Sequence, residues 1–118
     1  MEKTDIFFEE IRKGNLLTIA KMVKENQNLL HTKDQRGSTP LILASYYNQE
    51  EIATYLIENG ANIDAVDGSG NTALMGVCFK GYITLVHKLI SYGANVNVRN
   101  TMGATALIYA ATFKQFEI

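Results

Sequence analysis

A short sequence motif that begins with glycine recurs every 33 residues, and this repeat limits the possible folds more than any other feature of the chain. Gly37, Gly70 and Gly103 are 33 positions apart, and each begins the pattern Gly-x-Thr, then Pro or Ala, then Leu. Residues 56–64 likewise recur at 89–97, where a Leu-Ile pair is again followed by Gly-Ala-Asn. The first 33 or so residues are interpreted as a degenerate copy whose register slips by one residue. Self-similarity at this period indicates a stack of short, similar units.

The glycine motif, with the residues just before it, is typical of a turn that leads into a helix. The side chain of Asp34 can accept the backbone amide two residues later, and Gly37 supplies the positive φ that ends the turn. Thr39 then suits the N-cap of a helix, and Pro40 suits its first position. The pattern predicts a helix over residues 40–47 and the same elements in each later copy. The later turns begin at Asp67 and Asn100, the later caps are Thr72 and Thr105, and the first helices end at Asn48 and Gly81.

A second helix is expected in each unit, with an apolar stripe at positions i, i+4 and i+5. The stripe residues are Ile52, Leu56 and Ile57 in one copy and Leu85, Leu89 and Ile90 in the next, and Gly60 and Gly93 end these helices. Two helices this short cannot bury their apolar faces alone, so the units are predicted to stack as a solenoid. The expected core residues are Leu41, Leu74 and Leu107, and the small residues that let neighbouring helices approach are Ala44, Val77 and Ala110.

The run Asp34-x-x-Gly37-x-Thr39-Pro40-Leu41-x-x-Ala44, followed by Gly-Ala-Asn-x-Asp at 60–64, resembles the ankyrin repeat, and the resemblance covers essentially the whole chain. It implies an all-α solenoid of stacked helix-turn-helix units with β-hairpin-like turns. The turns and first helices of such a stack line a concave face, and the family nearly always binds other proteins there. The chain departs from the pattern where the family often has a histidine; these positions are Ile42, Met75 and Ile108.

We expect one domain over residues 1–118, comprising an N-terminal capping repeat (1–33), two full repeats (34–66 and 67–99) and an incomplete, truncated repeat (100–118). Charged residues give the first unit the polar side of a cap; they are Glu9, Glu10, Lys21, Lys24 and Glu25. The last unit lacks a second helix to cover its apolar residues, which include Leu107, Ile108 and Phe113. Self-association through this uncapped C-terminal repeat is therefore expected.

Composition excludes several classes of function. The chain carries 11 basic and 12 acidic side chains, a net charge of −1, which predicts no affinity for nucleic acid or for anionic lipid. No apolar stretch reaches the roughly 18 residues that a membrane span needs, so no membrane partner is expected. Cys78 is the only cysteine, which rules out an intrachain disulfide and favours a reducing, cytoplasmic location.

Three candidate chemical motifs give way to simpler interpretations. Residues 68–73 match the dinucleotide pattern G-x-G-x-x-A, but the next copy lacks the first glycine and no acidic residue follows at the expected spacing of about 20 residues. Residues 67–78 lack the glycine and glutamate of a calcium loop. Cys78, His31 and His87 lie in different segments, without the spacing of metal ligands. We therefore predict no enzymatic activity, no cofactor and no metal.

The predicted function is that of a protein–protein interaction module, an adaptor or scaffold that binds a protein partner through the concave face. Paired residues at the ends of the first helices are its expected anchors: Arg12, Lys13, Tyr46, Tyr47, Phe79, Lys80, Thr112 and Phe113. Turn residues form its expected rim: Gln35, Arg36, Ser38, Ser69, Asn71, Thr101 and Met102. The alternative is a structural or targeting segment of a larger effector or enzyme whose activity lies outside these 118 residues.

Overall fold

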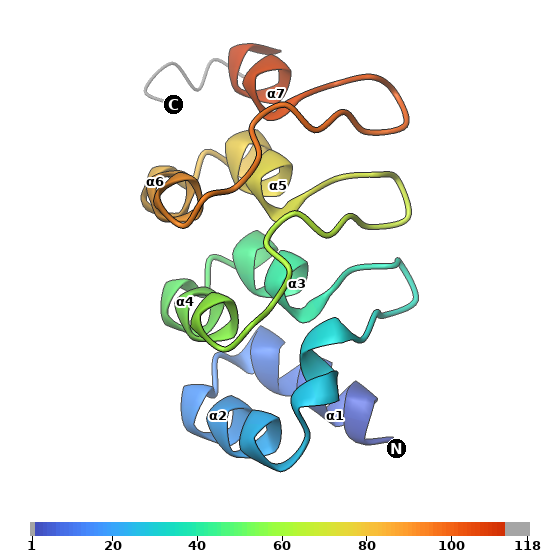
Figure 1. The fold of residues 1–118 in the computed structure, drawn as a ribbon, viewed down its shortest axis with the longest axis vertical. Helices are drawn as coiled ribbons and strands as arrows, with labels where there is room; N and C mark the ends of the chain where they lie inside the picture. Colours follow the sequence, from blue (N-terminus) through green and yellow to red (C-terminus); the bar gives the residue numbers. More distant parts are fainter. Residues whose placement is uncertain (1, 113–118) are drawn as a thin grey trace.

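The computed structural model describes residues 2–112, which form a vertical stack of helix pairs (Figure 1). The helices, in chain order, are α1 (Lys3–Lys13), α2 (Leu16–Glu25), the 3₁₀ helix η1 (Gln27–His31), α3 (Pro40–Tyr46), α4 (Glu50–Glu58), α5 (Ala73–Lys80), α6 (Ile83–Ser91) and α7 (Ala106–Thr112). The described residues contain no β-strand. The predicted all-α fold is confirmed.

The stack has two layers of helices and a row of projecting turns. α1, α3, α5 and α7 form the inner layer, in which each helix packs on the next. α2, α4 and α6 form an outer layer on one side, and the long turns before α3, α5 and α7 project on the other (Figure 1). The turns and the inner layer together border one open face of the molecule.

Each turn is held by its leading Asp or Asn. Asp34 Oδ1 accepts the backbone amides of Arg36 and Ser38, both at 2.9 Å, and Gly37 has a φ of +80°. Asp67 and Asn100 make the same pairs of hydrogen bonds in the later turns. Because a short polar side chain satisfies two amides locally, the turns take the predicted hairpin-like shape without pairing as strands.

Successive turns are also bonded to one another. The amide of Gly68 donates to Arg36 O at 3.1 Å, and that of Thr101 donates to Ser69 O at 3.0 Å. A Cβ atom added at Gly37 would lie 2.7 Å from the nitrogen of Gly68, closer than atoms can approach. Glycine is therefore needed at position 37 both for its positive φ and for the spacing between units.

Threonine caps begin the inner helices, as predicted. The backbone amides of Ile42 and Met75 donate to the hydroxyl oxygens of Thr39 and Thr72, each at 3.2 Å. Thr105 makes the equivalent bond at 3.4 Å. Left-handed residues end the helices at the other side, with Asn48 at a φ of 57° and Gly81 at 75°. Gly14, at a φ of 80°, ends α1 in the same way, 34 rather than 33 residues before Asn48, which is the predicted one-residue slip.

The core runs between the two helical layers, and two sequence expectations about it are wrong. Leu41 and Leu74 are buried, as are the small residues Ala44, Val77 and Ala110. Leu107, which the repeat placed with the core residues, is 70 % exposed, in line with the separate expectation that the last unit is uncovered; α7 is the last helix among the described residues.

The second error concerns the outer helices. Ile90 is exposed and Ile57 only half-buried, whereas Ala53 and Val86 are buried. At about 100° per residue, position i+1 lies nearer the centre of the stripe formed by i and i+4 than position i+5 does. The buried stripe is therefore i, i+1, i+4, that is, Ile52, Ala53 and Leu56, and Leu85, Val86 and Leu89.

Candidate functional site

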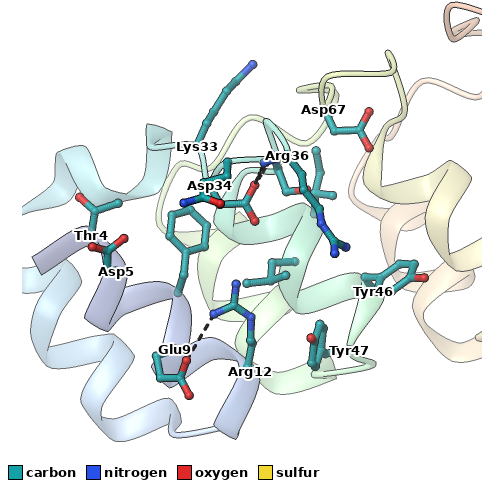
Figure 2. A pocket seen from close by; sticks show the side chains of 15 residues that line it. Thr4, Asp5, Glu9, Arg12, Lys33, Asp34, Arg36, Tyr46, Tyr47 and Asp67 are labelled. Atoms are coloured by element: carbon teal, nitrogen blue, oxygen red, sulfur yellow. Dashed lines mark hydrogen bonds and ion pairs between the residues drawn. The ribbon is translucent and has the colours of Figure 1, made fainter. Parts of the chain in front are cut away.

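The open face contains a hollow of about 830 Å³ between α1, the first turn and α3. Its walls come from α1, from the turn and from the C-terminal end of α3 (Figure 2). The lining residues are Thr4, Asp5, Phe8, Glu9, Arg12, Lys33, Asp34, Gln35, Arg36, Ser38, Ile42, Leu43, Tyr46, Tyr47 and Asp67. Arg36 extends from the turn toward Tyr46, whereas the guanidinium of Arg12 on α1 turns to Glu9 (Figure 2).

The charges of this hollow are mixed in sign. Four carboxylates and three basic side chains line it, a net charge of −1. Arg12 pairs with Glu9 at 3.4 Å, and Lys33 Nζ donates to the carbonyl of Val66 at 3.3 Å. Arg36 forms no ion pair with any described residue. Such a surface lacks the basic stripe that a nucleic-acid backbone requires.

A second, smaller hollow of about 240 Å³ continues the face toward α5 and α7. It shares Ile42, Tyr46 and Asp67 with the first, so the two adjoin. Its walls are otherwise mostly apolar and comprise Asn71, Thr72, Ala73, Met75, Gly76, Phe79 and Tyr109. Phe79 packs edge-on against Tyr109, with ring centroids 6.1 Å apart.

Three large aromatic side chains are accessible along this face. Tyr46 is 44 % exposed, Tyr47 46 % and Phe79 42 %. The rings of Tyr46 and Tyr47 lie against each other, with centroids 6.3 Å apart. The ammonium of Lys80 lies 4.9 Å from the centroid of the Tyr46 ring, at a distance typical of a cation–π contact. These contacts fix the orientation of the rings while leaving much of their area open to solvent.

The structure places most of the sequence-predicted residues on this face. Arg12, Gln35, Arg36, Ser38, Tyr46 and Tyr47 line the larger hollow, and Asn71 and Phe79 line the smaller one. Lys13, Ser69, Thr101 and Met102 are exposed but line neither. The side chains of Thr112 and Phe113 lie outside the described residues.

Two of the predicted rim residues present little side-chain surface. Ser38 is 9 % exposed, because it immediately precedes the cap of α3 and its amide donates to Asp34. The side chain of Asn71 also has a partner within the protein, since its oxygen accepts a hydrogen bond from the side-chain amide of Asn100 at 2.8 Å. Both residues therefore hold the turns together more than they present surface.

Sequence reasoning missed several lining residues, of which two groups are informative. The first comes from α1, namely Thr4, Asp5, Phe8 and Glu9. Interpreting residues 1–33 as a degenerate copy places these residues on its inner helix, so that interpretation was a usable signal. The second group is Met75, Gly76 and Tyr109, whose accessibility depends on how α3, α5 and α7 pack together.

The remaining candidates for chemistry do not assemble a site. Cys78 is 1 % exposed, and burial raises the pKa of its thiol to about 11, so it is neutral near pH 7. His31 ends η1 and His87 lies on α6, and both side chains are exposed. No group of three metal-ligating side chains occurs among residues 2–112. Within the same residues, every helix is too short or too polar to cross a bilayer.

Comparison with known families gives one match. Residues 41–90, which run from α3 to the end of the apolar part of α6, match the model of a family described as ankyrin repeats (many copies). The match falls on the two units described above, in which an Asp side chain holds the turn and a threonine caps the first of two paired helices. Residues 41–90 therefore belong to the ankyrin repeat family, and the seven stacked α-helices, with no strand among the described residues, fit that fold.

Proposed function

We propose that this chain is a binding module that captures a partner protein on the face formed by its turns and inner helices. Ankyrin repeats are generally protein–protein interaction modules. The observation that carries the proposal is the row of three accessible aromatic rings, Tyr46, Tyr47 and Phe79, beside two adjoining hollows. Aromatic residues and arginine are the side chains most enriched at the energetic centres of protein interfaces.

The surroundings of the rings suit this role. Tyr46 and Tyr47 contact each other and Lys80 covers one of them, so little side-chain freedom remains to be lost when a partner binds. Arg36 extends toward Tyr46, where its guanidinium can donate several hydrogen bonds in fixed geometry, and Arg12 lines the same hollow in an ion pair with Glu9. The mixed charges at the rim would orient a partner more than they would add affinity.

A photo-crosslinking experiment tests the proposal. A benzoylphenylalanine introduced at Tyr47 should crosslink a protein that the same group at Thr84, exposed on α6, does not reach. The protein that is crosslinked is identified and purified without the crosslink, and its affinity for the unmodified chain is measured by calorimetry.

The double change Tyr46→Ala and Tyr47→Ala should weaken this affinity by about 100-fold or more, because each hot-spot truncation typically costs at least about 2 kcal/mol. Glu51→Ala, on the exposed side of α4, should leave it unchanged. Glu58 is not a suitable control, since its carboxylate accepts a hydrogen bond from the Tyr92 hydroxyl at 2.9 Å. If the double variant folds and binds the partner with unchanged affinity, the open face is not the binding surface.

We also propose that the chain self-associates through α7. Leu107 and Ile108 are exposed there, and Met102 in the preceding turn is exposed as well. Their counterparts in the unit before, Leu74 and Met75, are buried. Apolar residues clustered at one end of the described stack favour contact with another molecule, and a second copy of the chain offers the same surface.

A further inference from the structure

A glycine in the middle of α5 interrupts the inner layer. Positions 43, 76 and 109 are equivalent in three successive units, since they are 33 residues apart, and they hold Leu43, Gly76 and Tyr109. Two of the three units thus place a large side chain at this position of the inner helix. Glycine within a helix is destabilising relative to alanine, because the unfolded chain loses more backbone freedom.

The backbone gives no reason for glycine at position 76. Gly76 is absent from the glycines with positive φ, so any residue could adopt its conformation. A Cβ atom added there would have no neighbouring atom within 4 Å, so close packing does not demand glycine either. Both tests give the opposite answer at Gly37. What the missing side chain does is leave open the 240 Å³ hollow, whose wall includes Gly76.

The size and chemistry of this hollow define what fits it. Its volume is below the about 300–1,000 Å³ that pockets for drug-sized ligands occupy, and it corresponds to a single side chain. Ile42, Met75, Phe79 and Tyr109 make the walls mostly apolar. Asp67 is the one charged residue among the lining residues.

Asp67 has capacity for a further partner. One carboxylate oxygen accepts the amides of Ser69 and Asn71, each at 2.9 Å, and the carboxylate forms no ion pair with any described residue. The ammonium of Lys80 lies over the Tyr46 ring instead, and Arg36 lines only the larger hollow. The charge carried by the residues that line the smaller hollow is therefore that of Asp67, which is negative.

We propose that Gly76 opens a specificity pocket for one aliphatic or aromatic side chain of an extended partner segment, and that a Lys or Arg next to that side chain pairs with Asp67. This inference rests on the proposed function and specifies the partner's chemistry: an apolar residue adjacent to a basic one. The pocket lies between α3, α5 and α7, so a bound segment would run along the inner layer and cross more than one unit.

The probe for this pocket is a phage-displayed library of random dodecapeptides, selected on the folded chain. The most enriched sequence is synthesised and titrated by fluorescence anisotropy against the chain and its variants. Enriched peptides should share an apolar residue next to Lys or Arg. Gly76→Leu, which restores the side chain found at position 43, should weaken binding at least about 10-fold while the melting temperature stays equal or rises, since leucine favours helix.

Three further proteins complete the design. Gly76→Ala should stabilise α5 and weaken binding to a smaller degree, which separates occupancy of the pocket from damage to the fold. Thr84→Leu adds the same leucine to an exposed position of α6 and should change neither property. Asp67→Asn keeps the turn, because Asn100 already holds its own turn with the same two amide bonds, and removes only the charge.

Asp67→Asn should weaken the basic peptide about 10-fold and have no effect on the same peptide with glutamine in place of its basic residue. If the peptide binds the Gly76→Leu variant as tightly as the wild-type chain, the inference is overturned. If the same peptide fails to bind the double variant Tyr46→Ala with Tyr47→Ala, the proposed function still stands, without the pocket. A selection that yields no binder also overturns the inference, whereas the crosslinking experiment tests the function without any peptide. Binding that appears only after residues 113–118 are deleted would make that segment the occupant and would contradict a partner side chain.

Discussion

At the scale of single residues, the environment of Cys78 decides what its thiol can do. The residue lies on α5 and is 1 % exposed, and burial raises its pKa from 9.0 to about 11. The thiolate is the reactive form, so both its scarcity and its inaccessibility oppose reaction. We expect iodoacetamide at pH 8 to label Cys78 slowly in the folded chain and quickly in urea. Equal labelling rates in the two conditions would show that the thiol is accessible.

The same shift makes stability depend on pH. Between about pH 9 and 11 the folded chain retains a proton on Cys78 that the unfolded chain releases, so stability is complete below pH 9 and falls as pH rises. The loss approaches about 3 kcal/mol, from about 1.4 kcal/mol per pKa unit. Urea unfolding from pH 8 to 11 measures it. The Cys78→Ala variant should lack this part of the decline, which isolates it from the titration of tyrosines and lysines.

At the scale of elements, the short inner helices depend on their caps. The Thr72 hydroxyl accepts the Met75 amide and is 2 % exposed, so no water can replace it easily. We expect Thr72→Ala to lower the free energy of unfolding by about 1 kcal/mol. Thr105→Ala should cost less, because its bond is longer and lies at an exposed site. Denaturant melts of both variants, with Thr84→Ala as a control, would measure the two losses in stability. Equal midpoints for all three variants would show that the caps do not contribute to stability.

The elements also show where sequence reasoning works and where it fails. The turn at Asp34, the positive φ of Gly37 and the cap at Thr39 were predictable, because each depends on atoms within four residues. The pocket beside Gly76 was not predictable, because it depends on how α3, α5 and α7 pack against one another. Tyr46 and Tyr47 are accessible at the end of α3, where the repeat placed them, and their part in binding stays a prediction.

At the scale of the whole molecule, neighbouring units share one core, and burial at equivalent positions differs along the stack. Leu74 is 2 % exposed between two units, whereas its equivalent Leu107 is 70 % exposed. We expect Leu74→Ala to destabilise the chain by about 2–5 kcal/mol through loss of packing and creation of a cavity. Leu107→Ala should cost less than about 1 kcal/mol. Urea melts compare the two, and similar losses would show that Leu107 is covered in solution.

Cover for Leu107 would have to come from another molecule or from residues beyond 112, and association distinguishes the two. If two copies meet through α7, sedimentation velocity of the wild-type chain should show an average mass that rises with concentration. Leu107→Glu should abolish this rise, because it places a charge in an apolar contact, and Leu17→Glu should not, although Leu17 on α2 is even more exposed. A wild-type mass that stays monomeric at every concentration would contradict self-association. Equal suppression by both substitutions would instead indicate a general effect of charge on solubility, and α7 would then not be the contact.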